Sequence, residues 1–225
     1  MRSKASGFCY INDPAVAINF LLKQGKRVAY VDIDAHHGDG VQAAFYDTDK
    51  VLTISLHESG EFLFPGTGFP EDSGAGQGRG YSINLPFPPD TGDELFTRGF
   101  EEIAPSFIQA YKPDILVTQL GVDTFASDPI THLSLTTNGF ETMVKRFRSF
   151  GLPWVALGGG GYDPDNVKRA WTLAWAIMNR VEDRENLIEL RDKTLKEKTT
   201  NAQRKSVEEA IMYLKKEVLP LVRGG

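Results

Sequence analysis

The densest group of reactive side chains lies in one short segment of the chain. Within eight residues it holds five ionisable groups, Asp32, Asp34, His36, His37 and Asp39. The apolar run 27–34 (RVAYVDID) predicts a strand that ends here, and strand side chains alternate between two faces. Asp34 and His36 are therefore expected on one side, where a carboxylate and an imidazole form half of a zinc site. Such a concentration of charge is costly without a metal or a hydrogen-bond network; the alternative is a polar turn before a helix near Gly38.

A third candidate ligand, Asp123, follows another predicted strand, 114–120 (DILVTQL). If the two strands are parallel neighbours, its carboxylate lies at the same edge of the sheet as Asp34 and His36. Three protein ligands and one open position are typical of a catalytic zinc rather than a structural one. Taken alone, Asp123 is equally consistent with a turn or helix-capping aspartate.

A third segment adds a phenol. Four glycines, 158–161, follow the predicted strand 153–157 (PWVAL) and precede Tyr162. Glycine permits close approaches and backbone conformations that side chains block, and a phenol beside a bound carbonyl can donate a hydrogen bond to a developing oxyanion. The alternatives are a flexible turn with a packing tyrosine, or a phosphate loop, which the absence of a following Lys-Ser or Lys-Thr makes less favourable.

The elements that must position these residues alternate along the chain. Strands are predicted at 27–34, 51–56, 81–85, 114–120 and 153–157, with helices between them, which indicates an α/β fold with a mainly parallel sheet. Ligands of such sheets bind beyond the carboxyl ends of the strands. A helix capped by Asp13, a helix over 95–111 that Pro105 is expected to kink or split, and a helix over 166–180 are predicted.

Two further segments complete the predicted elements. The last helix is expected to open with a capping box at Ser206 and Glu209. The Gly- and Pro-rich segment 58–80 has no helical period, and a loop of that length in a compact domain is usually functional. Phe8 and Phe64 can wall an apolar channel, although aromatic side chains are more often part of the core. His57 and His132 are isolated in the sequence and are expected to be ordinary core or surface histidines.

Composition limits the classes of protein that the chain can be. Its 225 residues suit one large domain or two small ones, and a net charge of −5 argues against a general nucleic-acid binder. No apolar run is long enough to span a bilayer, so no membrane association is expected. The single cysteine, Cys9, excludes an internal disulfide framework, and a cytoplasmic location is the default expectation. The oligomeric state is left open.

Together the motifs resemble a known family. The segments 6–13 (SGFCYIND), 31–40 (VDIDAHHGDG), 64–68 (FPGTG), 119–123 (QLGVD) and 158–162 (GGGGY) closely resemble, in the same order, the histone deacetylase superfamily. The branch that looks most similar is that of the bacterial acetoin-utilisation deacetylases. The resemblance covers nearly the whole chain and implies an arginase-like, three-layer α/β fold around a mainly parallel sheet. It makes residues 1–225 the C-terminal two-thirds of a single deacetylase domain.

The resemblance also implies a reaction and assigns residues to it. It implies zinc-dependent hydrolysis (with iron as the alternative metal) of N-acetyl-lysine, or of a small acetylated amine, to acetate and a free amine. By motif, the metal ligands are Asp34, His36 and Asp123, and Tyr162 stabilises the transition state. The residues that match the substrate pocket are Gly7, Phe8, Phe64, Ile130 and Gly160. Structural potassium ions are implied at Asp32, Asp34, His36, Ser55 and Leu56, and at Phe45, Thr48, Val51 and Tyr81.

The chain departs from the family pattern at its beginning. In the family, two adjacent histidines that act as general base and acid lie a few residues before the motif that starts here at Ser6. Asp32 and Asp39 match the carboxylates that orient them, but the sequence begins at Met1 and no histidine precedes His36. The N-terminal third of the family's usual length is therefore expected to be missing. General acid–base assistance contributes on the order of 10²–10⁴-fold, so the alternative function is a non-catalytic acyl-lysine or metal-binding module.

Overall fold

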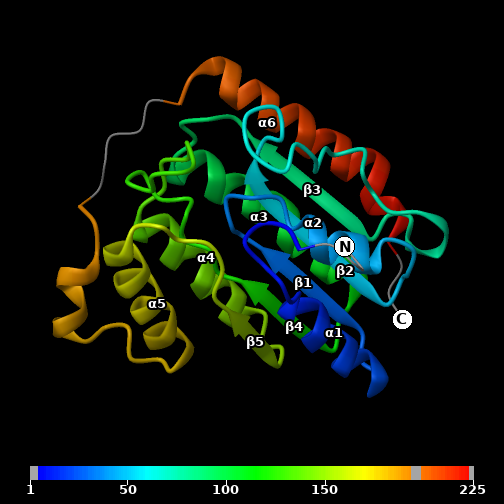
Figure 1. The fold of residues 1–225 in the computed structure, drawn as a ribbon, viewed down its shortest axis with the longest axis horizontal. Coiled ribbons are helices and arrows are strands. Elements are labelled where there is room, and N and C mark those ends of the chain that lie inside the picture. The colour runs from blue at the N-terminus through cyan, green and yellow to red at the C-terminus, as the bar shows by residue number, and fades with distance from the viewer. Residues whose placement is uncertain (1–4, 194–198, 223–225) are drawn as a thin grey trace.

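A computed structural model describes residues 5–193 and 199–222 of the chain. Its centre is a five-stranded sheet in the order β3-β2-β1-β4-β5, and every pairing is parallel (Figure 1). The strands are β1 (Val28–Asp32), β2 (Val51–Glu58), β3 (Ser82–Phe87), β4 (Ile115–Gln119) and β5 (Trp154–Leu157). All five correspond to strands predicted from the sequence. Because they are parallel, their carboxyl ends share one edge of the sheet.

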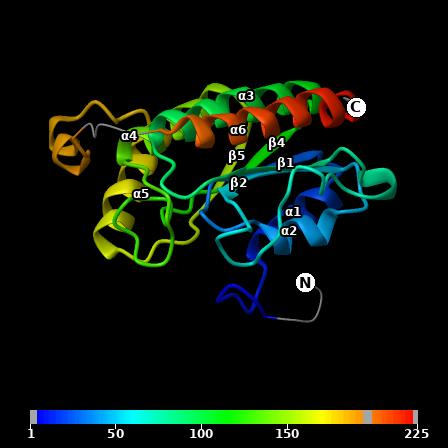
Figure 2. The same ribbon diagram turned by 90° about the horizontal axis from the view of Figure 1, so that it is seen from above.

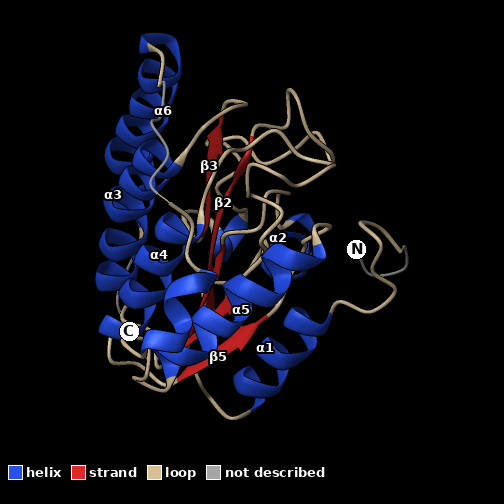
Figure 3. Ribbon diagram, turned by 90° about the vertical axis from the view of Figure 1, so that its left-hand side faces the viewer, coloured by secondary structure: helices blue, strands red, loops and turns tan. Residues whose placement is uncertain are grey.

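Helices cover both faces of this sheet (Figure 2). On one face lie α1 (Asp13–Lys23) and α2 (Asp39–Phe45); on the other lie α3 (Asp93–Tyr111), α4 (Thr137–Ser149) and α6 (Asn201–Tyr213). The helix α5 (Pro164–Met178) packs on α4. Figure 3 shows the strands edge-on, with long loops gathered beside β2 and β3. The chain is therefore built in three layers, as predicted.

Alternation along β1 explains the two cores. Ala29 and Val31 belong to the large core under α3 and α4, whereas Val28 and Tyr30 belong to the smaller core under α1 and α2. All five residues of β1 are buried. A strand covered on both faces must be apolar at nearly every position, which is why these strands are nearly continuous apolar runs in the sequence.

The helices show where local patterns mislead. Pro105 lies inside α3, which runs unbroken from Asp93 to Tyr111. Proline removes one helical hydrogen bond, but neighbours such as Ile103 and Phe107 are fully buried, and this packing holds the helix together. The first helix is capped by Asn12, whose side chain accepts from Ala15 N, so Asp13 is already inside it.

The last helix begins earlier than the sequence predicted. Its capping box is formed by Thr200 and Gln203, not by Ser206 and Glu209. The apolar face expected for it is nevertheless present, because Val207, Ile211, Leu214 and Val218 are buried. Three 3-10 turns and a π-helical turn complete the described elements: Gly76–Gly78, Glu185–Leu190, Leu219–Leu221 and Leu214–Val218. No described helix combines the length and apolar character needed to cross a membrane.

Candidate metal centre and active site

Three ionisable side chains meet just beyond the carboxyl ends of β1 and β4. One ligand atom from each of Asp34, His36 and Asp123 lies within 4.8 Å of the others. His36 Nδ1 lies 2.9 Å from Asp123 Oδ2 and 3.2 Å from Asp34 Oδ1. Asp123 is fully buried and Asp34 nearly so. The structure therefore brings together the three residues that the sequence singled out, from segments 87 positions apart.

Backbone groups aim these carboxylates. Ala35 N donates to Asp123 Oδ1 at 2.8 Å, and Gly160 N donates to Asp34 Oδ2 at 2.6 Å. A Cβ atom at Gly160 would lie 2.1 Å from Asp123 Oδ2, so any side chain there would displace a carboxylate. Gly160 was predicted to line the substrate pocket; its contacts here are with the two carboxylates. The glycine run thus permits the close approach that the sequence analysis expected of it.

The electrostatics of the group follow from burial and charge. Burial by itself lowers the pKa of His36, but its hydrogen bonds to Asp123 and Asp34 outweigh this and raise it to about 10. Burial and the neighbouring charge of Asp34 raise the pKa of Asp123 to about 7. The pKa of Asp34 is lowered, because its hydrogen bonds with His36 and Gly160 outweigh the effect of burial. Two buried carboxylates therefore share one positive charge.

This donor set fits a divalent metal ion. Two carboxylates and one imidazole are ligands that zinc accepts, and their ligand atoms lie within 4.8 Å of one another. The buried negative charge of Asp34 and Asp123 needs a positive partner, and a metal ion is a stronger one than a protonated histidine. The structure thus supports a metal-binding trio without identifying the ion.

Tyr162 lies beside the trio and contacts Phe8. The Tyr162 ring meets the Phe8 ring edge to face, with 5.9 Å between the ring centroids. Burial, together with the charges of Asp123 and Asp34, raises the pKa of the Tyr162 hydroxyl to about 12. Phe8 is 82% exposed and Phe64 56% exposed, and Ile130 also reaches the surface. The apolar channel predicted for these side chains stays a prediction. Gly7 and Phe8 both have positive φ values, as in a left-handed turn.

Asp32 and Asp39 occupy different environments. Asp32 is buried, accepts hydrogen bonds from the Tyr30 hydroxyl at 2.7 Å and from Asp34 N at 3.0 Å, and burial raises its pKa well above the usual value. Asp39 is half-buried at the first position of α2. The alternative of a polar turn before a helix near Gly38 is therefore also present, because Gly38 caps α2 directly after the metal-binding trio.

Comparison with known proteins gives this geometry a family. The sequence model of the histone deacetylase domain matches residues 1–178. The chain belongs to the histone deacetylase family. It is 44% identical over 188 residues to the acetoin utilization protein AcuC of Bacillus subtilis (strain 168), covering 80% of this chain and 49% of AcuC. It is 45% identical over 176 residues to histone deacetylase 1 of Homo sapiens, covering 78% of this chain and 36% of the human protein.

Solved structures agree. An HDAC homolog complexed with SAHA superposes with a TM-score of 0.83, and an HDAC homolog from Aquifex aeolicus with 0.84. Each is 36% identical and covers 94% of this chain and 64% of the solved chain. The predicted arginase/deacetylase-like α/β fold is confirmed. The chain spans about half the length, or less, of the curated relatives it matches.

The predicted potassium residues fall at opposite ends of β2. Ser55 pairs in register with Asp32 near the carboxyl end, and Leu56 follows it. Phe45, Thr48 and Val51 lie at the amino end; Tyr81 just precedes β3, and its carbonyl accepts from Thr53 N at 2.9 Å. Both potassium sites, and the residues assigned to each, stay predictions.

Sequence reasoning missed a buried histidine pair behind the trio. The His37 and His57 rings lie 4.8 Å apart, and His57 bonds to Ser55 Oγ at 2.9 Å and to the Gly68 carbonyl at 3.0 Å. His37 bonds to Thr67 Oγ1 at 2.8 Å. These contacts fasten the 58–80 loop to the sheet. No local signal could have revealed them, because the partners are up to 30 residues apart.

Two more buried carboxylates near these residues were not predicted. Glu58, buried at the end of β2, accepts hydrogen bonds from His132 N at 2.8 Å and from His132 Nδ1 at 2.7 Å. Asp128, also buried, accepts from Tyr162 N at 2.8 Å and from Ile130 N at 3.1 Å. The dipeptide Asp128-Pro129 is an ordinary turn signal, and the sequence does not show that its carboxylate meets Tyr162.

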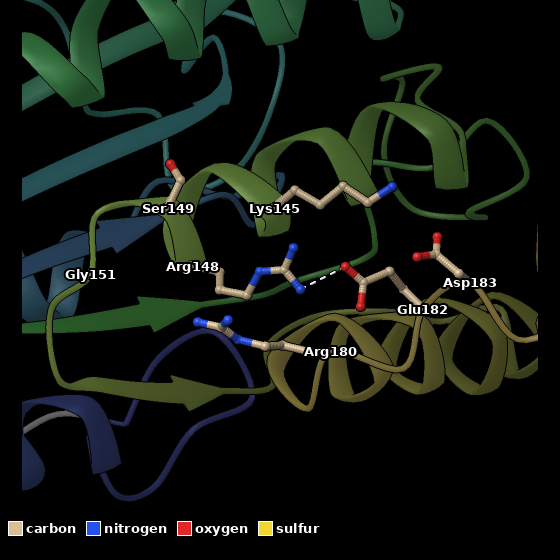
Figure 4. Close-up of a pocket in the computed structure, with 7 residues that line it drawn as sticks. All are labelled: Lys145, Arg148, Ser149, Gly151, Arg180, Glu182 and Asp183. Carbon is tan, nitrogen blue, oxygen red and sulfur yellow. Dashed lines mark hydrogen bonds and ion pairs between the residues drawn. The ribbon is translucent and has the colours of Figure 1, made fainter.

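A separate cleft lies away from the metal-binding trio. It measures about 500 Å³ and sits where α4 and α5 end, beside the amino end of β5 (Figure 4). Arg148 Nη1 and Glu182 Oε1 form an ion pair of 2.6 Å across it. The lining residues carry charges of both signs: Lys145, Arg148, Ser149, Gly151, Arg180, Glu182 and Asp183. The cleft is thus at the opposite end of the sheet from the trio.

Proposed function

We propose that the protein carrying this chain is a metal-dependent deacetylase that hydrolyses N-acetyl-lysine, or a small acetylated amine, to acetate and a free amine. The observation that carries the proposal is the trio of Asp34, His36 and Asp123 beside Tyr162 in a member of the histone deacetylase family. Zinc is the proposed ion, with iron as the alternative. We extend the proposal to residues 1–225 as one deacetylase domain that holds potassium at both ends of β2.

The residues of the chain divide the work. Asp34, His36 and Asp123 would hold the ion, which when bound supplies polarisation of a carbonyl and activation of water. Tyr162 keeps its proton at neutral pH, because its pKa lies near 12, and can donate a hydrogen bond to the oxyanion as water adds to the acetyl carbon. Phe8 and Phe64 offer apolar surface to the lysine stem. The C–N bond then breaks, and the amine must leave with a proton.

No histidine of this chain is placed to supply that proton, and this favours a second candidate function for residues 1–225 taken alone. Each of the four histidines has partners already: His36 belongs to the trio, His37 bonds to Thr67, His57 to Ser55 and Gly68, and His132 to Glu58. None is free beside the trio to act as a general acid. A metal-binding module that holds acylated amines without hydrolysing them is therefore the alternative.

Acetate release decides between these functions. The protein carrying the chain, and residues 1–225 alone, are each loaded with zinc and given an acetyl-lysine peptide and acetylated small amines. We expect release of acetate by the longer protein, sensitivity to a hydroxamate, and loss of both in His36→Ala. His132→Ala is the matched control, since that side chain is largely exposed. Zinc and peptide binding without acetate release by either protein would favour the module and overturn the deacetylase.

A further inference from the structure

The loop that follows β4 approaches the tyrosine segment and is tied to it at one buried carboxylate. Asp128 lies in residues 124–136, between β4 and α4, and is 7% exposed. Its two oxygens accept separate bonds: Oδ2 accepts from Tyr162 N at 2.8 Å, and Oδ1 accepts from Ile130 N at 3.1 Å. One side chain therefore holds the backbone of the proposed oxyanion donor and that of the proposed pocket wall.

Tyr162 needs such an anchor because of what precedes it. Four glycines lead into it, and Gly159 and Gly161 have φ values of +139° and +148°. A glycine run has more conformations to lose than any other sequence of that length. Upstream, Gly160 is held by Asp34 and Val122; at Tyr162 itself the backbone N–H bonds to Asp128. Without that bond, the backbone of Tyr162 would have the freedom that the preceding glycines give it.

Neighbouring contacts support the loop without touching Tyr162. Ser127 Oγ donates to Asp163 Oδ2 at 2.6 Å and accepts from Asn166 Nδ2 at 2.8 Å. Thr131 Oγ1 donates to the Asp123 carbonyl. The loop is therefore fixed at several points, and Asp128 is the one that reaches the tyrosine backbone. This arrangement supplies matched variants that separate loop stability from tyrosine placement.

We propose that Asp128 is a positioning residue, which sets Tyr162 and Ile130 in register with the metal-binding trio through their backbone N–H groups. The inference rests on the proposed function. Donors to a developing oxyanion act only when held within about 0.5 Å of the productive position. Asp128 touches no reacting atom, so its effect must pass through Tyr162 and appear in the rate of the chemical step.

A double-mutant cycle tests this dependence. In the zinc-loaded protein that carries the chain, Asp128→Ala is expected to lower kcat by about 10- to 100-fold, with a smaller change in KM. Asp128→Asn, which can accept only one of the two bonds, should fall between. In a Tyr162→Phe background, Asp128→Ala should cost less than about 3-fold more. Equal losses in both backgrounds would show that Asp128 only stabilises the loop, and would overturn the proposal.

A second measurement does not depend on turnover. Hydrogen exchange at the backbone amides of Tyr162 and Ile130 is expected to be slow in the wild type and in Ser127→Ala, and at least about 10-fold faster in Asp128→Ala. Asp128→Asn replaces the alanine variant if the latter does not fold. Unchanged exchange at Tyr162 would overturn the proposal even if the enzyme is active. If wild type releases no acetate, the proposed function fails, and exchange alone decides whether Asp128 anchors the tyrosine.

Discussion

At the scale of single residues, the trio pairs two buried carboxylates with one protonated imidazole. Two carboxylates, Asp34 and Asp123, share the proton of His36, whose pKa of about 10 keeps it charged at neutral pH. An ion bound to Nδ1 requires that proton to leave, since a metal binds the neutral imidazole. Metal binding and protonation therefore compete at the same atom.

This competition predicts proton release on metal binding. At pH 7, His36 is protonated, so zinc binding should displace at least one proton. Because protonated ligands bind poorly, zinc affinity should rise as pH increases from 6 towards the pKa of His36. Calorimetry in buffers of different ionisation enthalpy counts the protons. Release of none at pH 7 would contradict the ligand set, and His132→Ala should release as many as wild type.

Tyr162 makes a second residue-scale prediction. Tyr162→Phe removes the hydroxyl proton that its pKa of about 12 retains, and leaves the metal ligands in place. We expect kcat for acetate release to fall by about 10²–10³-fold, while zinc affinity, measured by competition with a chelator, changes little. Gly160→Ala should instead weaken zinc binding, because its Cβ would collide with the carboxylate of Asp123. A tyrosine variant that loses zinc would argue for a structural role instead.

At the scale of elements, the 58–80 loop is held by the buried pair His37 and His57, and substitutions at two glycines test that attachment. Gly68 has φ +89°, and a Cβ there would lie 2.5 Å from His57 Nε2. Gly66 has φ +79°, and a Cβ there would meet only Gly60 O, at an ordinary contact distance of 3.8 Å. Gly66→Ala should lower the free energy of unfolding by about 1 kcal/mol from backbone strain alone. Gly68→Ala should lower it by about 2–4 kcal/mol, since strain and overpacking add. Urea unfolding measures both losses. Equal losses would mean that the His37–His57 pair shifts to accommodate a side chain at Gly68 without cost.

The elements also show what the sequence could and could not reveal. All five strands were predictable, because burial on both faces makes each an apolar run. The helix α4 was not predicted, although Phe140, Met143, Val144 and Phe147 are buried at helical spacing, because it follows a long loop of polar and turn residues. The pattern Ser206-x-x-Glu209 occurs inside α6, where its residues continue a helix already capped at Thr200. Such short motifs fit a helix interior as well as its start.

The candidate site likewise contains residues that the sequence could reveal and residues that it could not. Asp34, His36, Asp123 and Tyr162 were predictable because parallel strands bring their carboxyl ends to one edge of the sheet. The partners that hold them were not, because Asp128 and the His37–His57 pair depend on loops that return from elsewhere in the chain. Reactive residues at strand ends can thus be recognised in the sequence, whereas the residues that hold them in place are revealed only by the tertiary structure.

At the scale of the whole molecule, an ion bound to the trio should stabilise the fold. The ligands come from the ends of β1 and β4, so unfolding separates them and releases the ion. At a free zinc concentration 100 times the Kd, the free energy of unfolding should rise by about 2.7 kcal/mol. Thermal unfolding with zinc and with a chelator measures this difference. It should vanish in His36→Ala and persist in His132→Ala; a shift in both would place the ion elsewhere.

The buried histidine pair gives the molecule a dependence on pH that can be separated from the metal. Burial, and then the charge of His37, lower the pKa of His57 to about 3 in the folded chain, against about 6.5 when unfolded. Above pH 6.5 neither state holds the proton; as pH falls from 6.5 towards 3, the unfolded chain gains it and the folded chain does not. The free energy of unfolding should therefore fall by up to about 1.4 kcal/mol per pH unit in that window.

His57→Gln removes this titration and should flatten the slope, even if it lowers stability at pH 7 through the lost contacts with Ser55 and Gly68. Gly66→Ala should keep the wild-type slope, since it changes no titratable group. Urea unfolding at pH 7, 6 and 5, with a chelator present throughout, compares the three proteins while His36 and Asp123 titrate identically in each. Parallel slopes for wild type and His57→Gln would show that folding does not lower the pKa of His57, and would contradict the prediction.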